Sequence, residues 1–398
     1  MSRLRRSALI FGALLATLLL AACSSQPLRN MEPGEQPAED TDEGGLWDAL
    51  ADSERALQRS PLLVRDEALN RYVNGLVCRY AGEYCKDIRV YIIRRPYFNA
   101  SMAPNGVMQI WTGALLRAEN EAQLGFVLGH EIGHFLGQHS IKQWRRTKDT
   151  ANALSLLQLI AAGSPSASAG DAFDVALFAA YASLFKYSRD HERESDLHGF
   201  ERSVALGYDA NQGWKLWQAL LAEENARDRR KPSSVFATHP ATEERLTTLR
   251  REAEALPTNG DGTGSAEFSD ALRPFLTTWL ADEVQRRNYP QTLVLLDRLQ
   301  SRPEVPNAGM LAYFRGEVFR KRRAPGDDKR AIDAYVAALD LPGYPAETMR
   351  ALGYAFRRVE DIESANEAFA DYLEARPNAD DRALIEHLMT EPVRRHED

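Results

Sequence analysis

The chain has 398 residues, 44% of them hydrophobic, which is long enough for two or three domains with buried cores. Its formal net charge of −8 argues against a nucleic-acid-binding protein, because neutralising phosphates requires clustered lysine and arginine side chains. The composition indicates neither a disordered chain nor a coiled coil.

The N-terminus is typical of an exported lipoprotein. A positively charged start precedes an apolar run from Ala8 to Leu20, which is too short to span a bilayer about 30 Å thick. The tetrapeptide LAAC ending at Cys23 resembles a bacterial lipobox, although a plain signal peptide or a membrane anchor is the alternative. We expect a signal peptide over residues 1–22 and a lipid on Cys23. By similarity to Gram-negative lipoproteins, Ser24 after the cysteine implies anchoring to the outer membrane, on its periplasmic face.

Two further expectations depend on export. Residues 23–45 are rich in proline, glycine and acidic residues, which predicts a flexible tether. Cys78 and Cys85 then lie outside the reducing cytosol, and we expect a local disulfide between them.

The elements that follow predict a mainly α protein with a small antiparallel sheet. Residues 46–84 carry apolar side chains at helical spacing. The stretches 88–93, 98–102 and 107–111 are short and rich in β-branched, aromatic or turn-flanked residues, so we expect three strands. Asn120 then caps a helix.

The rest of the chain divides at a glycine-rich stretch. Residues 151–187 hold two apolar helical segments, interpreted either as a buried hairpin or as a surface that touches a membrane or a membrane protein. Residues 257–268 predict a linker. It would separate a first domain over residues 46–256 from a helical domain over residues 269–392.

The second domain resembles tetratricopeptide repeats, with generic amphipathic helices as the alternative. The resemblance lies in the spacing of small, alanine and aromatic residues along each unit, and at least three units are needed to bury a continuous core. The clearest unit has Gly353, Ala365, Phe369 and Pro377, the preceding one has Gly316, Ala331, Tyr335 and Ala338, and a weaker one begins at Tyr289.

The stretch LGHEIGHFLGQHS carries the chemistry. His130 and His134 are four residues apart on the predicted helix, so both imidazoles lie on one face and can bind one zinc ion. Zinc lowers the pKa of bound water toward about 7, and Glu131 is placed to act as the general base when that water attacks a peptide carbonyl. The motif is short enough to arise by chance, and its position on an apolar helix after a sheet favours the functional interpretation.

His139 does not fit the same site. Its spacing resembles the third metzincin ligand but is one residue short, and no methionine follows the motif before Met310. If the helix continues to Ser140, His139 lies opposite His130. We expect a residue at the helix end, where the dipole favours a cation.

A catalytic zinc ion needs a third protein ligand, and residues 187–200 offer one. Glu192 and Asp196 share a helix face, so Glu192 can bind zinc while Asp196 accepts a ring N–H from a ligating histidine. A merely charged helix surface with Arg189 and Arg193 explains the same residues equally well.

Together these motifs resemble the gluzincin metalloproteases related to the CAAX prenyl protease and HtpX, which implies that residues 46–256 form a zincin-like metalloprotease domain. The resemblance implies that Glu192 is the third zinc ligand and Asp196 its neighbour. It extends to a lipid-anchored periplasmic branch with C-terminal repeats, in which the segment THPATEERL implies His239 as a switch ligand and Arg245 as an active-site residue.

The resemblance also implies the activity. We expect a zinc endopeptidase that degrades misfolded or stalled outer-membrane proteins and assists their assembly, with the repeats docking on the assembly machinery. Asn99–Met102 is our choice for the sheet edge that holds extended substrates. The alternative is a chaperone or scaffold with a largely latent zinc site.

Overall fold

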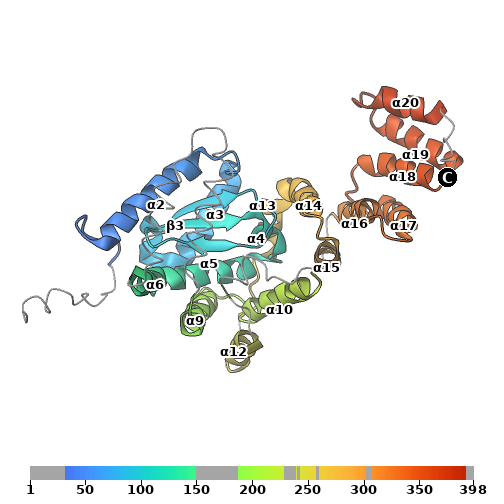
Figure 1. The fold of residues 1–398 in the computed structure, drawn as a ribbon. Helices are drawn as coiled ribbons and strands as arrows, with labels where there is room; N and C mark the ends of the chain where they lie inside the picture. The colour runs from blue at the N-terminus through green and yellow to red at the C-terminus, as the bar shows by residue number, and fades with distance from the viewer. Residues whose placement is uncertain are drawn as a thin grey trace, which may run out of the picture.

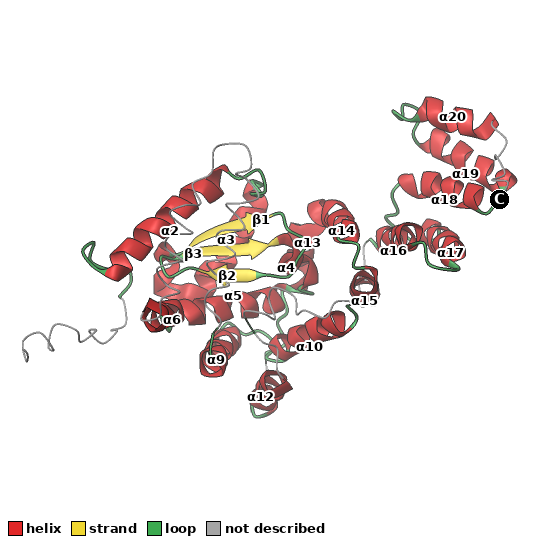
Figure 2. Ribbon diagram, in the orientation of Figure 1, coloured by secondary structure: helices red, strands yellow, loops and turns green. Residues whose placement is uncertain are grey.

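The computed structural model describes residues 32–148, 187–227, 239, 243–256, 260–301 and 307–390. Across these ranges the chain is mainly helical around one small sheet, which confirms the expected class (Figures 1 and 2). Cys23, the start of the tether and nearly all of the apolar stretch 151–187 lie outside the described residues. In the described part, no helix is long and apolar enough to cross a membrane.

The sheet is mixed, where the sequence predicted an antiparallel one. Its order is β1 (Arg89–Ile93), β3 (Val107–Trp111) and β2 (Ala100–Met102). A tight turn makes β2 and β3 an antiparallel hairpin, whereas β1 pairs with β3 in parallel. The difference arises because β2 does not pair with β1. The chain instead leaves room beside β1, and β3 then fills the place between β1 and β2, so β3 is the central strand and β2 an edge.

Helices cover both faces of the sheet. Alternate residues of β3 point to opposite sides, so Val107 and Trp111 pack with α2 (Asp42–Arg59) while Met108 and Ile110 join the main core. That core includes α3 (Glu67–Ala81), which Asp66 caps by accepting the amide of Leu69. After α3 comes the 3₁₀ helix η1 (Gly82–Asp87), and the expected Cys78–Cys85 disulfide joins the two.

The motif helix lies beneath the sheet (Figure 2). The short α4 (Thr112–Arg117) leads into α5 (Glu121–Leu136), and Asn120 caps α5 as predicted by accepting the amide of Gln123. The helices α6 (His139–Lys148), α9 (Arg189–Ala205), α10 (Gln212–Asn225) and α12 (Glu243–Glu254) follow.

The segment predicted as a linker packs against the protease part where it is described. Thr263 accepts the amide of Ala122 at 3.1 Å, and Gly262 accepts the amide of Asp209 at 2.9 Å. Next, α13 (Ser265–Leu272) buries Phe268 in the core shared with α3 and α5. The core continues through the helices η2 (Arg273–Phe275), α14 (Leu276–Gln285), α15 (Tyr289–Gln300) and α16 (Ala308–Arg322). The domain boundary itself stays a prediction.

The C-terminal helices form hairpins that project away from the sheet (Figure 1). They are α16 with α17 (Asp327–Leu339), α18 (Glu347–Arg358) with α19 (Ile362–Ala375), and the final α20 (Arg382–Thr390). A Cβ at Gly316 would meet the Tyr335 ring at 2.3 Å, and one at Gly353 would meet the Phe369 ring at 2.5 Å. Both hairpins thus use the same close contact, while their assignment as tetratricopeptide repeats stays a prediction.

Candidate metal centre

Close packing of α5 on α9 brings the site together. A Cβ at Gly129 would lie 2.9 Å from the Cα of Gly199, and one at Gly133 would lie 2.9 Å from the Cα of Ser195. The two backbones can approach this closely only because glycine occupies α5 at these positions. The contact places the acidic face of α9 against the two motif histidines.

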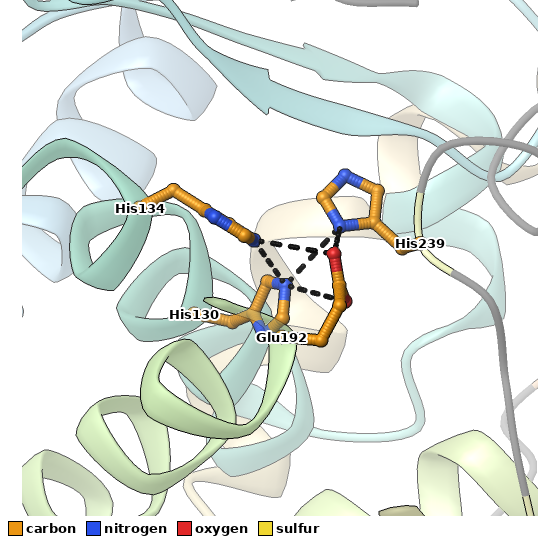
Figure 3. Close-up of side chains that lie close together, drawn as sticks. All are labelled: His130, His134, Glu192 and His239. Carbon is orange, nitrogen blue, oxygen red and sulfur yellow. Dashed lines mark hydrogen bonds and ion pairs between the residues drawn. The ribbon is translucent and has the colours of Figure 1, made fainter. Parts of the chain in front are cut away.

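Four buried side chains converge at this crossing, as Figure 3 shows. One ligand atom from each of His130, His134, Glu192 and His239 lies within 4.8 Å of the others. His130 Nε2 is 3.0 Å from His134 Nε2 and 3.3 Å from His239 Nδ1. His239 Nδ1 is in turn 3.0 Å from Glu192 Oε1. The structure therefore brings together all four residues that were predicted to bind zinc.

The chemistry of this group fits a zinc ion. Imidazole nitrogens and one carboxylate are ligands that zinc accepts, and each can direct a lone pair at a common point. Glu192 Oε2 is buried and, within the described residues, forms no hydrogen bond, although Arg245 Nη1 lies 2.7 Å away as an ion-pair partner. These residues would hold a single ion.

Asp196 orients His130. Its Oδ1 lies 2.9 Å from His130 Nδ1, which leaves His130 Nε2 to face the other ligands. Arg245 binds the same carboxylate with two hydrogen bonds, of 2.6 Å from Nε to Oδ2 and 2.7 Å from Nη2 to Oδ1. Burial alone would raise the pKa of Asp196, but the charge and hydrogen bonds of Arg245 outweigh it and hold that pKa below its usual value.

Glu131 is buried on the same helix and is not among the converging ligands. Burial raises the pKa of its carboxyl group, partly offset by the charge of His239. His239 Nε2 lies 3.8 Å from Glu131 Oε1 while its Nδ1 lies 3.0 Å from Glu192 Oε1, so the His239 ring contacts both the ligand cluster and the predicted base.

Two aromatic residues that sequence reasoning missed also shape the site. Trp217 on α10 carries the Arg245 guanidinium 4.4 Å over its ring and lies 6.3 Å from the His130 ring. Tyr187 stacks on His134 with 3.8 Å between ring centres. Tyr187 precedes α9 and Trp217 lies in α10, so neither forms a local motif with the histidines. Only the tertiary structure identifies them.

The prediction for His139 was wrong in part. The helix α5 ends at Leu136, and Gln138 adopts φ 51°, so the chain turns and His139 begins a new helix. The imidazole folds back, with Nδ1 3.0 Å from His134 Nδ1. Burial, with the nearby His191, lowers the pKa of His139 to about 4, which contradicts the expected cation at a helix end.

Comparisons with known proteins agree with this site. Residues 64–253 match peptidase family M48. A putative beta-barrel assembly-enhancing protease of Vibrio cholerae is 28% identical over 211 residues, which are 51% of this chain and 43% of that protein. The beta-barrel assembly-enhancing protease of Escherichia coli K12 is 26% identical over 210 residues, which are 51% of this chain and 42% of that protein.

A mitochondrial metalloendopeptidase is also similar. OMA1 of Schizosaccharomyces pombe is 29% identical over 168 residues, which are 42% of this chain and 46% of that protein. The matches thus span less than half the length of these relatives. Residues 64–253 thus match peptidase family M48 and are similar to the beta-barrel assembly-enhancing proteases, and they include the buried cluster whose chemistry fits a single zinc ion.

Proposed function

We propose that this chain is a zinc endopeptidase of the bacterial envelope that cleaves unfolded or misassembled outer-membrane proteins. The observation that carries the proposal is the convergence of His130, His134 and Glu192 beside the carboxylate of Glu131. The names of the two bacterial relatives support the substrate class. The lipobox ending at Cys23 supports a lipid anchor in the outer membrane, facing the periplasm.

The residues divide the chemical work between them. His130, His134 and Glu192 would hold zinc, which supplies Lewis acidity to polarise the peptide carbonyl and to lower the pKa of water. Glu131 would take a proton from the attacking water on a carboxylate oxygen and deliver it to the leaving amine. Asp196 fixes the ring of His130, and Arg245 fixes Asp196 and Glu192.

The edge strand β2 is the surface that we propose for extended substrates. Asn99 and Ala103 bond to the central strand β3, so the alternation of an antiparallel pair directs the backbone groups of Ala100 and Met102 away from β3. All three residues of β2 are buried here, so a peptide would pair with this edge only after it is uncovered. Because β2 is the strand nearest α5, a peptide added there would run close to the helix that carries His130 and His134 (Figure 2). Main-chain pairing of this kind selects unfolded chains with little regard to sequence.

Replacing the proposed base tests the activity. Glu131→Gln keeps the size of the side chain but cannot accept a proton, so casein cleavage should fall by at least about 100-fold. Zinc content should be unchanged, because Glu131 is not among the four converging ligands. Retained cleavage by the purified variant would overturn the proposal.

Replacing His239 tests whether the structure represents a closed site. His239→Ala removes the ring that contacts both Glu131 and the other ligands, and it leaves three zinc ligands. Casein cleavage should then rise several-fold while about one zinc per chain is retained. The same variant in the Glu131→Gln background should stay inactive, and a fall in activity with zinc loss would instead make His239 a permanent ligand.

The position of His239 also favours a second candidate, a chaperone or scaffold with a latent zinc site. In that case the C-terminal helical hairpins would bind the outer-membrane assembly machinery, and proteolysis would be secondary. A deletion strain complemented by Glu131→Gln, but not by a chain with a disrupted repeat surface, would favour this candidate.

A further inference from the structure

His139 lies directly behind one of the proposed zinc ligands. It is fully buried, and its Nδ1 is 3.0 Å from His134 Nδ1, on the side of that ring away from the ligand cluster. Its Nε2 is 3.1 Å from Glu194 Oε2 on α9. A chain of contacts therefore runs from His134 through a second imidazole to a carboxylate.

The positions of the protons on the two imidazole rings follow from the carboxylate of Glu194, which ends this series of contacts. An ionised carboxylate only accepts hydrogen bonds, so the contact with Glu194 requires a proton on His139 Nε2. A neutral His139 then has a lone pair on Nδ1, which can accept the Nδ1–H of His134. Ser195 Oγ, 3.4 Å from the same nitrogen, is a second donor to that lone pair. With its proton on Nδ1, His134 presents a lone pair on Nε2 to the ligand cluster.

We propose that His139 is a positioning residue that, backed by Glu194, fixes the tautomer and ring orientation of His134 for zinc binding. The proposal rests on the zinc site of the proposed function. His139 would thus do for His134 what Asp196 does for His130, which donates its Nδ1–H directly to that carboxylate. Both anchoring carboxylates belong to α9, which also supplies the ligand Glu192.

The surroundings hold the His139 ring in this place. His191 stacks on it with 4.1 Å between ring centres and 9° between planes. A Cβ at residue 137 would lie 2.5 Å from His139 Nε2, so the glycine there leaves room for the ring. The Glu194 side chain is 60% exposed, so water weakens its contribution and the imidazole provides most of the constraint.

Zinc affinity tests the proposal with a matched pair of variants. His139→Phe keeps the ring and its stacking but removes the acceptor, and His191→Phe makes the same change one ring farther from the ligand. Chelator competition should show a dissociation constant raised about 10- to 100-fold for His139→Phe and nearly unchanged for His191→Phe. Equal affinities for wild type and His139→Phe would overturn the proposal.

Two further measurements keep the test decisive if His139→Phe fails to fold. His139→Gln has a carbonyl oxygen that can accept from His134, so it should bind zinc more tightly than His139→Leu. In the metal-free wild type, long-range proton–nitrogen NMR of ring-labelled histidine should show His139 protonated on Nε2 and His134 on Nδ1. The opposite tautomers would refute the assignment.

The outcomes separate this inference from the proposed function. A wild-type chain that binds no zinc would remove the function and the inference together. A wild type that binds zinc and cleaves casein, with a His139→Phe variant of equal affinity, would remove the inference alone.

Discussion

Arg245 serves two buried carboxylates at once. It makes paired hydrogen bonds to Asp196 and an ion pair with Glu192, and its guanidinium lies over the Trp217 ring. Buried charges require such partners, because removing one partner leaves the other uncompensated in a medium that solvates it poorly. The arginine thus stabilises the acidic face that the site depends on.

Arg245→Gln should therefore destabilise the fold. The two carboxylates would lose their main counter-charge, and the free energy of unfolding should fall by about 3–5 kcal/mol, measured in urea without metal. The exposed Arg251 on the same helix, paired with Glu252, is a suitable control. Its change to glutamine should cost less than about 1 kcal/mol, and equal losses for the two variants would contradict the role given to Arg245.

Local spacing predicted only part of the site. His130, Glu131 and His134 lie within one helix, so their shared face follows from helical geometry. The face shared by Glu192 and Asp196 was equally local, but its proximity to the histidines depends on the α5–α9 crossing. His139 was misread because a left-handed residue, Gln138, ends the helical geometry on which the prediction relied.

At the level of elements, α17 begins with a carboxylate that is tied to several donors. Asp327 accepts hydrogen bonds from Arg322, from Arg330 and from the amide of Ala324. The hydrogen bond from Arg322 is the main cause that lowers the pKa of Asp327 to about 2. A carboxylate in the first turn also interacts well with the helix dipole.

The stability of this hairpin should depend on pH in a defined direction. Because the folded pKa of Asp327 lies below its unfolded value, its contribution is complete above about pH 4 and is lost as pH falls toward 2. Asp327→Asn should therefore be less stable than wild type by about 1–3 kcal/mol at pH 6. Urea unfolding at several pH values should show this gap closing under acid, and a constant gap would contradict it.

The elements themselves were largely predictable, unlike the pairing between them. Alternating and helical apolar patterns located the strands and most helices, since these patterns depend on near neighbours. The parallel pairing of β1 with β3 is a long-range choice that no local pattern records. The packing of Phe268 into the protease core likewise contradicts what a glycine-rich segment suggests about a free linker.

At the scale of the whole molecule, a buried cluster of charges joins the protease part to the C-terminal helices. Arg117 on α4 bonds Glu223 on α10 at 2.6 Å and pairs with Glu283 on α14 at 3.0 Å. Arg298 on α15 bonds Glu223 as well, at 2.9 Å. Since α10 also carries Trp217, the cluster connects α14 and α15 to the surroundings of Arg245 and His130.

Arg117→Met should loosen this junction. It leaves two buried carboxylates facing an apolar side chain, at an expected cost of about 3–5 kcal/mol. Calorimetry of the variant should then show the C-terminal helices unfolding at a lower temperature than the protease part. In the wild type, we expect both parts to unfold in one transition. Arg315→Met, which removes a partly exposed pair with Asp297, should leave the transition nearly unchanged. A single unshifted transition in Arg117→Met would show that the cluster is dispensable.

The placement of a ligand and both anchors on α9 limits how this sequence can change length. One residue inserted between Glu192 and Glu194 would rotate the later side chains by about 100° and move them away from the histidines they contact. Residues added at a turn outside the helix, such as the one at Gly207, leave that register intact. Insertions and deletions should therefore be tolerated around α9 and excluded from within it.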